Sequence, residues 1–401
     1  MNNAICIIVL RHEDMFVYLQ QNQGVMSTIV NPFIATGKVP AEYFCDRNEE
    51  TKRLTQSLTN GANIVLMSPR RVGKTQLMIH CFDQPQISNQ YITVFIDILK
   101  TSTLNEFTYE LGKAVFNALA SRGQKMLKMM LASMHSLVGN VGFDMTTGLP
   151  TFGISIGDIH NPSYSLEEIF KTLESADKKC IVAIDEFQQI ANYPEKNIEA
   201  LLRSHIQRLS NAQFIFAGSE RHLLEKMFLD SARPFYNSAD IQNLDIIELE
   251  KYADFVRHHF ITNDKQIEVE AINYIYETFD GNTYYNQKAF REAYAMTSVE
   301  SACTQMTAEL VITQMVSEAA RHYSEIMARL ALPQKELLYA IAKEHRARQI
   351  TSGSFIRRHS LKSASSVQSS IKKLLSFGLV SFENGDYYIA DQLMRLWLSE
   401  R

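Results

Sequence analysis

Three consecutive residues, Gly73, Lys74 and Thr75, have the types and order needed to bind the phosphates of a nucleotide. They follow a short apolar run, residues 62–68, and open a segment with helical character. Backbone N–H groups at a helix N-terminus attract phosphate oxygens, and the helix dipole adds to this attraction. In such a loop the lysine contacts the outer phosphates and the threonine hydroxyl ligates Mg²⁺. The expected phosphate-binding residues are Ser68, Pro69, Arg70, Arg71, Val72, Gly73, Lys74, Thr75 and Gln76.

The loop departs from the usual spacing G-x-x-x-x-G-K-[ST], because Ser68 stands where the first glycine is expected. Ser68 is small enough to start the turn. Pro69 removes one N–H donor and fixes its own φ near about −65°. We therefore expect residues 70–75 to bind phosphate, while Arg70 and Arg71 either contact the phosphates or face solvent.

A second motif, "CIVAIDE", places two acids at the end of an apolar strand. Asp185 would hold Mg²⁺ directly or through water, and Glu186 would polarise an attacking water as a general base. The alternative is a solvated strand end with two surface acids. Because the two motifs support each other, the sequence predicts an Mg²⁺-dependent ATPase with ATP and Mg²⁺ as its ligands.

Other polar residues follow the remaining strands. Ser219, after Gly218, is expected to sense the γ-phosphate or to belong to a simple turn. Asp97 either supports the metal ligands or caps a helix. A hydrolytic site often uses an arginine against developing charge. We place Arg203 in that catalytic role, although each candidate could also be a surface or salt-bridged residue; the others are Arg208, Arg221 and Arg233.

The elements that must position these residues alternate between strand and helix. Four apolar runs are typical of buried parallel strands, and helical segments separate them. We therefore predict an α/β fold, a P-loop NTPase parallel sheet flanked by helices. After about Leu249 we expect a helical region without strands, followed from Pro333 by a last unit that ends in a strand-like hairpin. The predicted strands are residues 62–68, 91–99, 178–190 and 212–219.

Bulk composition excludes several classes of protein. The 401 residues suggest two or three domains. The net charge of −4 argues against a chain that binds polyanions over its whole surface. Five scattered cysteines without a C-x-x-C pair indicate neither a zinc site nor a disulfide framework and fit a reducing cytoplasm. No run reaches the ~18 apolar residues of a membrane span. Residues 1–25 are either an extension or a mis-assigned start before Met26.

The tail is basic. Between residues 335 and 373 there are nine lysines and arginines but only two glutamates. Three predicted helices followed by a hairpin are typical of a winged helix. Residues 335–390 therefore either contact DNA or bind a protein partner. Trp397 is expected to pack as core. The helix of residues 364–376 has an apolar face of Val367, Ile371, Leu374 and Leu375, and a polar face of Ser366, Gln368, Ser369, Lys372 and Lys373 that would meet a DNA groove.

Taken together, these motifs resemble the prokaryotic AAA-type ATPases related to the STAND NTPases, often called archaeal-type ATPases. The matching text includes "SPRRVGKTQL", "IVAIDEFQQI" and "FIFAGSERHLLEKMF", and the resemblance covers residues 28–401. It implies an ATP-binding core, a helical lid and a winged-helix tail. We place the ATPase core at residues 28–248, the helical lid at residues 249–330 and the winged-helix domain at residues 331–401, after an N-terminal extension of residues 1–27.

The resemblance also bears on single residues. It implies that Phe44 and Arg47, in an F-x-x-R-x-x-E segment, pack on the adenine side of the nucleotide. Loops of the form [GS]-P-R-R-x-G-K-[ST] are common in this group, so Ser68 and Pro69 are within its variation. Thr283 stands where the lid of related proteins often has a proline that senses the nucleotide. In this respect the lid departs from the family pattern. Two functions stay open: an ATPase switch, and a nucleotide-gated DNA-binding protein with little turnover. A homo-oligomer or a protein partner is compatible with both.

Overall fold

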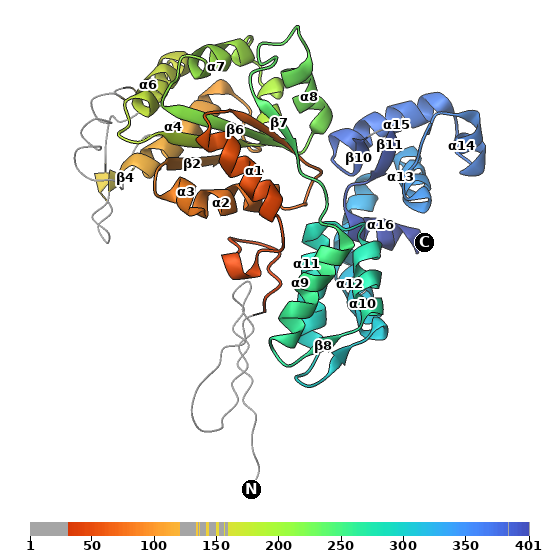
Figure 1. The fold of residues 1–401 in the computed structure, drawn as a ribbon. Helices are drawn as coiled ribbons and strands as arrows, with labels where there is room; N and C mark the ends of the chain where they lie inside the picture. The colour runs from red at the N-terminus through yellow and green to blue at the C-terminus, as the bar shows by residue number, and fades with distance from the viewer. Residues whose placement is uncertain are drawn as a thin grey trace. The chain divides into compact units, whose positions relative to one another are not determined.

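The computed structural model describes residues 31–120, 134, 136, 142–143, 150–151, 156, 159–383 and 385–400. The predicted extension, residues 1–27, lies outside this part of the chain. The described chain forms two units (Figure 1): Asp46–Ile247, and the residues up to Cys45 together with those from Glu248 onward. The domain limits read from the sequence stay a prediction.

The first unit is built on a five-stranded parallel sheet in the order β2-β5-β6-β1-β7. The expected strands are confirmed, and β1, β5 and β6 are buried along their whole length, as continuous apolar runs require. One further strand, β7, was not predicted, because its residues are mostly exposed at the sheet edge. The strands are β1 (Ile64–Met67), β2 (Ile92–Asp97), β5 (Cys180–Asp185), β6 (Ala212–Gly218) and β7 (Asp240–Asn243).

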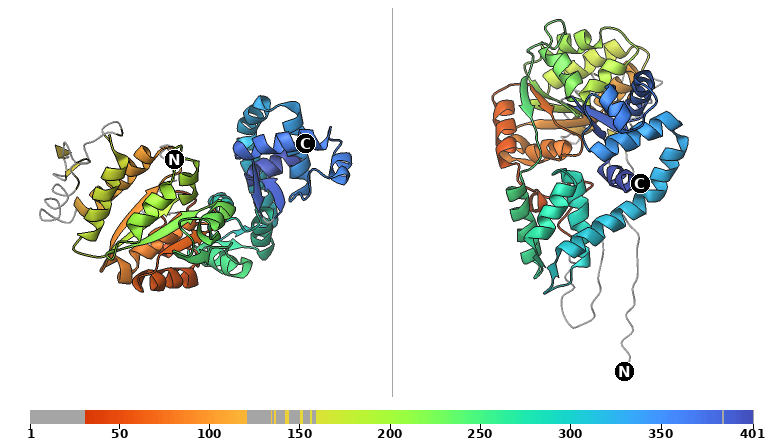
Figure 2. Two further views of the ribbon diagram at one scale, coloured as in Figure 1. Left: turned by 90° about the horizontal axis from the view of Figure 1, so that it is seen from above. Right: turned by 90° about the vertical axis from the view of Figure 1, so that its right-hand side faces the viewer.

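Helices cover both faces of this sheet (Figures 1 and 2). On one face lie α1 (Asn48–Thr59), α2 (Lys74–Asp83) and α3 (Pro85–Ser88). The opposite face packs against α4 (Leu104–Ala120), α6 (Pro162–Glu174), α7 (Ile198–Ile206) and α8 (Arg221–Leu229). Right-handed crossovers between parallel strands produce this division and bring every strand's carboxyl end to one edge. The predicted α/β fold with a P-loop type of sheet is confirmed.

Two smaller elements complete the first unit. A 3₁₀ helix, η3 (Phe187–Asn192), follows β5 directly. A short antiparallel pair, β3 (Gly142–Phe143) with β4 (Pro150–Thr151), lies in the glycine-rich region between α4 and α6. Most of that region lies outside the described residues.

The second unit begins with four helices, α9 (Leu249–Ile261), α10 (Val269–Thr278), α11 (Thr283–Met296) and α12 (Gln305–Arg329). The expectation that this helical region lacks strands is wrong, because β8 (Gln266–Ile267) and β9 (Ala302–Cys303) pair in parallel. Strands of two residues leave no periodic pattern in a sequence. Phe33 is fully buried among the rings of Phe255, Phe260, Phe290 and Tyr294, so this early segment belongs to the helical unit.

The tail contains the elements of a winged helix. Its antiparallel hairpin, β10 (Val380–Glu383) with β11 (Asp386–Ile389), follows three helices and precedes a last one. Trp397 is buried and its ring lies 5.7 Å from that of Tyr323, which confirms its core role. Leu375 was assigned wrongly to the buried face, since it is 37% exposed. The helices are α13 (Leu332–Glu344), α14 (Gly353–Arg358), α15 (Ala364–Ser376) and α16 (Gln392–Ser399).

Candidate functional site

The loop between β1 and α2 lies at the carboxyl edge of the sheet. Gly73 is the N-cap of α2 with φ +94°, a left-handed conformation that glycine adopts without strain, and Arg71 also has positive φ. Alternating left- and right-handed residues turn successive N–H groups toward one point, which forms an anion-binding nest. The local sequence thus builds the predicted loop although its first glycine is absent.

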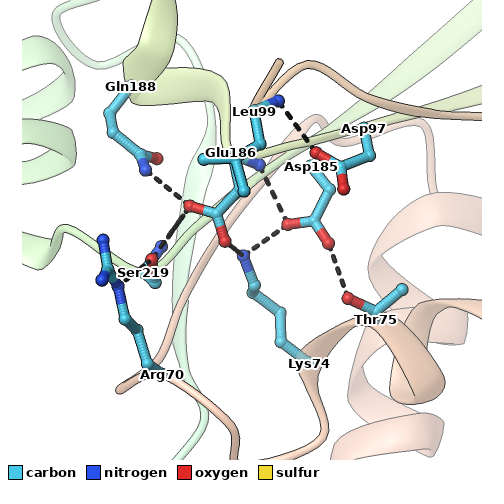
Figure 3. A network of polar contacts seen from close by, with 9 residues as sticks. All are labelled: Arg70, Lys74, Thr75, Asp97, Leu99, Asp185, Glu186, Gln188 and Ser219. Carbon is cyan, nitrogen blue, oxygen red and sulfur yellow. Dashed lines mark hydrogen bonds and ion pairs between the residues drawn. The ribbon is translucent and has the colours of Figure 1, made fainter. Parts of the chain in front are cut away.

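Lys74 joins this loop to the end of β5 (Figure 3). Its ammonium group bonds to one Asp185 oxygen and lies 3.1 Å from Oε1 of Glu186. The other Asp185 oxygen accepts a 2.6 Å hydrogen bond from the Thr75 hydroxyl. Lys74 and Asp185 are both buried. The two motifs that the sequence placed far apart therefore meet in one network, the edge cluster, made of Lys74, Thr75, Asp185, Glu186, Gln188 and Ser219.

Glu186 is held by both of its oxygens. Oε2 accepts hydrogen bonds from the Ser219 hydroxyl at 2.9 Å, the Ser219 N–H at 3.3 Å and the Gln188 amide at 2.6 Å. Its backbone has φ +55°, a conformation that is uncommon for a glutamate. Burial raises the pKa of the Glu186 carboxyl, but the Lys74 charge and the donated hydrogen bonds outweigh burial and leave that pKa below its usual value. Glu186 is thus ionised and oriented.

Gln188 is the member of the cluster that the sequence did not identify. It lies on η3, two residues after Glu186, and is 2% exposed. Its side chain lies against Gly218, where a Cβ atom would come within 2.0 Å of Oε1 of Gln188. The only signal in the sequence was an amide close to the acid pair.

Arg47 stabilises the loop through hydrogen bonds to its backbone. Its guanidinium donates to the carbonyl of Val72 at 3.2 Å and to that of Asp245 at 2.6 Å, and it pairs with Glu50 at 2.8 Å. Arg47 is buried, while Phe44 is half-buried and belongs to the other unit. Contact of either residue with adenine stays a prediction.

The other loop residues differ in exposure. Ser68 is buried, and its N–H bonds to the carbonyl of Gly218 at 3.4 Å, so that this donor is engaged within the sheet. Val72 is buried, whereas Pro69 and Gln76 are half-buried. Arg70 and Arg71 are exposed, and Nε of Arg70 lies 3.4 Å from the Ser219 hydroxyl. This contact brings Arg70 to the rim of the edge cluster.

Asp97 lies at the same edge but outside the cluster (Figure 3). Its carboxylate accepts the N–H of Leu99 at 2.9 Å, which is the bonding of a turn cap. This bond is neither a helix cap, since α4 begins only at Leu104, nor a contact with the expected metal ligands.

The four candidate arginines lie elsewhere. Arg203 is half-buried in the last turn of α7, which leads into the start of β6 and thus toward the amino edge of the sheet. Arg208 is exposed, Arg221 pairs with Glu225 at 3.0 Å, and Arg233 pairs with Glu199. Within the described chain, none of them bonds to the edge cluster, so the catalytic role assigned to Arg203 stays a prediction.

The donors of the cluster fit a magnesium ion. Mg²⁺ is bound through one or two protein oxygens together with substrate phosphates and waters. Thr75 and Asp185 offer a hydroxyl and a carboxylate oxygen 2.6 Å apart at the loop. Over the part of the chain that the structure describes, no group of three or more His, Cys, Asp or Glu side chains could hold a metal ion by itself. A metal here would therefore need the phosphates as further ligands.

A cavity of about 600 Å³ opens on the same unit, between α1, α2 and β7. Its wall is polar and includes Glu50 and Asp245, the neighbours of Arg47, with Leu66 and Leu77 at the base. No member of the edge cluster lines it. Among the described residues, no helix is both long and apolar enough to cross a membrane.

Comparison with known proteins agrees with this geometry. A family model described as an ATPase domain predominantly from Archaea matches residues 44–288, and a model described as a probable winged helix domain matches residues 321–400. No curated protein matches the chain.

Two solved structures are similar in fold. A Walker-type ATPase of Pyrococcus abyssi has a TM-score of 0.59 at 19% identity, covering 92% of this chain and 99% of that one. The ORC2 protein of Aeropyrum pernix, solved as ADPNP and ADP complexes, has a TM-score of 0.57 at 15% identity, covering 92% and 96%. At such identities the likeness concerns the fold.

Proposed function

The chain belongs to the family of ATPase domains that occur predominantly in Archaea, and from this premise we propose that it is an Mg²⁺-dependent ATP hydrolase working as a nucleotide-driven switch. The observation that carries the proposal is the edge cluster. A buried lysine, a hydroxyl, two acids and a polar residue converge from the start of α2 and the ends of β5 and β6 on one point of the sheet edge.

Binding of ATP follows from the donors at this edge. The N–H groups of residues 70–75 would receive phosphate oxygens, and Lys74 would turn from the two acids to the β- and γ-phosphates. Thr75 and Asp185 would hold Mg²⁺, which when bound neutralises charge on the phosphate oxygens. Nucleotide complexes of the ORC2 protein, which shares this fold, support the choice of an adenine nucleotide.

Hydrolysis needs a base beside the γ-phosphate. Glu186 would accept a proton from a water whose oxygen bonds to the γ-phosphorus. The bond from that phosphorus to the β–γ bridging oxygen then breaks, which gives ADP and phosphate. Ser219, bonded to Glu186 and near Arg70, would report the state of the γ-phosphate to the loop.

The switch would involve the remaining parts of the chain. We assign ATP binding to the sheet unit, Asp46–Ile247, a lid role to residues 249–330 and an output role to the winged helix of residues 331–401. Thr283, at the start of α11, occupies the lid position where the family often has proline, so we do not assign nucleotide sensing to this residue.

Phosphate release by the wild type and by Glu186→Gln tests the hydrolase. We expect the wild type to hydrolyse ATP in the presence of Mg²⁺ and the variant to show no detectable turnover. The ATP affinity of the variant should lie within a few-fold of that of the wild type. If neither protein releases phosphate, with or without duplex DNA, the hydrolase is excluded.

A second function, nucleotide-gated DNA binding, is favoured by α15. Gln368, Ser369, Lys372 and Lys373 are all exposed on this helix, while Val367 and Ile371 are buried beneath them. Not every cation of the tail is available, because Arg348 pairs with Asp386 and Arg358 with Glu344. A DNA backbone would therefore meet mainly the α15 face.

Duplex DNA binding at about 50 mM salt, where counterion release favours it most, tests this function. We expect Lys372→Glu/Lys373→Glu to weaken binding and to reduce the slope of log affinity against log salt by about 2, one for each contact. Lys52→Glu, at an exposed position of α1, is the control. Absence of binding by the wild type would leave a protein partner as the ligand of the tail.

A further inference from the structure

The side-chain amide of Gln188 is satisfied at its nitrogen but not at its oxygen. Oε1 of Gln188 is buried and accepts no hydrogen bond from any described residue. Leaving a buried acceptor unsatisfied is unfavourable, so an apolar side chain would suit this position better if only packing mattered. The gain must lie at the other end of the amide. There Nε2 donates a 2.6 Å hydrogen bond to the charged Glu186 carboxylate, and bonds to charged groups are stronger than neutral ones.

The surroundings hold Gln188 in this position. The preceding residue, Phe187, is fully buried, with its ring 4.6 Å from that of Phe216 and 5.4 Å from that of Phe235. On the other side, Gly218 leaves the space that the amide occupies, since a Cβ atom there would meet Oε1 of Gln188 at 2.0 Å. The glycine at the end of β6 is thus required by the close approach of Gln188 and, to a smaller extent, of Leu224, whose Cδ1 would lie 2.9 Å from that Cβ atom.

The two oxygens of Glu186 are consequently unequal. Oε2 has three donors, one on η3 and two on Ser219 directly after β6, whereas Oε1 bonds to Lys74. Of the four donors, Lys74 is the one that would also bind the phosphates of ATP. Its transfer to a nucleotide releases Oε1 and leaves Oε2 bound.

We propose that Gln188 is a positioning residue that, together with Ser219, holds Oε2 of Glu186 so that Oε1 is the oxygen that takes the proton from water. The effect of Gln188 on the rate of hydrolysis rests on the proposed hydrolytic function. The effect of its hydrogen bond on the Glu186 carboxylate does not. The hydrogen bond from Gln188 stabilises the ionised carboxylate whether or not the protein turns over.

The structural part is tested by a carboxyl titration of the full chain. Glutamate labelled with ¹³C at the carboxyl carbon gives a Glu186 resonance, which is identified by its loss in Glu186→Gln. We expect Gln188→Ala to move the Glu186 titration to higher pH. Gln189→Ala is the matched control, since this neighbouring amide donates to the carbonyl of Thr101 at 3.0 Å instead. An equal titration in wild type, Gln188→Ala and Gln189→Ala would overturn the inference.

The kinetic part uses the same variants. Loss of a hydrogen bond to a charged group should lower kcat about 10- to 100-fold in Gln188→Ala, with KM for ATP within about twofold, while Gln189→Ala stays near the wild type. Gly218→Ala should lower kcat similarly by displacing Gln188, and the double variant Gln188→Ala/Gly218→Ala should fall no further than Gln188→Ala alone.

The outcomes separate the two proposals. A wild type that hydrolyses ATP, with Gln188→Ala equal to Gln189→Ala in kcat, overturns the role of Gln188 and leaves the hydrolase standing. A wild type without turnover excludes the hydrolase, and the carboxyl titration then decides the Gln188 inference alone. If Gln188→Ala fails to fold, Gly218→Ala provides the same test of both readouts.

Discussion

Lys74 and Asp185 form a buried ion pair that links the start of α2 to the end of β5 (Figure 3). The pair brings a loop cation onto an acid of the strand end, with Glu186 as a second acceptor. A cation shared between two acids is poised to leave them for a phosphate group. ATP binding and hydrolysis as proposed above require this exchange.

Substitution of Lys74 by methionine should destabilise the protein as well as abolish ATP binding. Asp185 is only 3% exposed, so loss of its partner leaves a buried charge, which typically costs about 3 kcal/mol of the free energy of unfolding. Lys74→Met/Asp185→Asn should recover part of this loss. Denaturant unfolding of both variants measures the effect, and equal stability of single and double variants would contradict it.

Gly73→Ala should weaken nucleotide binding through the backbone alone. No atom lies within 4 Å of a Cβ at this position, but the residue has φ +94°. An L-residue in the left-handed region costs roughly 1–2 kcal/mol, and relief of that strain would rotate the loop N–H groups. Gly61→Ala, at φ +85° in equally open space, carries the same strain away from the loop. Calorimetric titration with ATP should show reduced affinity for Gly73→Ala, and an affinity equal to that of Gly61→Ala would refute this explanation.

Arg47→Ala should both destabilise the first unit and weaken ATP binding. Its guanidinium bonds two backbone carbonyls, of Val72 and Asp245, that lie far apart in the sequence. Hydrogen bonds of a charged group contribute about 1.5–3 kcal/mol, so we expect a loss of that size in the free energy of unfolding. The exposed Arg53, on the same helix, is the control. Thermal unfolding and ATP affinity that match those of Arg53→Ala would show that Arg47 does not support the loop.

The pH dependence of stability should reveal the ionised state of Glu186. Its pKa in the folded protein lies below the usual value of 4.5. An acid with a depressed folded-state pKa contributes stability that is fully present above its unfolded pKa and is lost as the pH falls through the folded pKa.

The measurement is chemical unfolding of the wild type and Glu186→Gln at several pH values from neutral to acidic. The wild type should lose more stability than the variant once the pH falls below about 4.5. Parallel curves for the two proteins would mean that Glu186 has an ordinary pKa when folded.

Much of the sheet could be predicted from the sequence because its strands are buried on both faces. Val65 and Ile181 lie in runs of apolar residues that parallel strands require, and turn residues bound each run. The same reasoning missed β7, since an edge strand such as Asp240–Asn243 faces water and needs no apolar pattern. Leu375 was misplaced for the converse reason: helical spacing puts it beside the buried face, yet 37% of its surface remains exposed.

The residues of the candidate site could be predicted where they are neighbours in the sequence. Lys74 and Thr75 are adjacent, and Asp185 and Glu186 end one strand, so residue types alone suggested their partners. The contact of Arg47 with Asp245 joins two segments that only the fold brings together. Likewise the fit between Gln188 and Gly218 depends on the spacing of η3 and β6, which no motif encodes.

The most direct test of the central claim, that Glu186 is the base for hydrolysis, is the chemical identity of the nucleotide retained by the protein. Wild type and Glu186→Gln are loaded with ATP and Mg²⁺, separated from free nucleotide, incubated and then denatured. The account predicts ADP from the wild type and intact ATP from Glu186→Gln, with equal amounts bound at the start. Equal conversion to ADP in both proteins would contradict it.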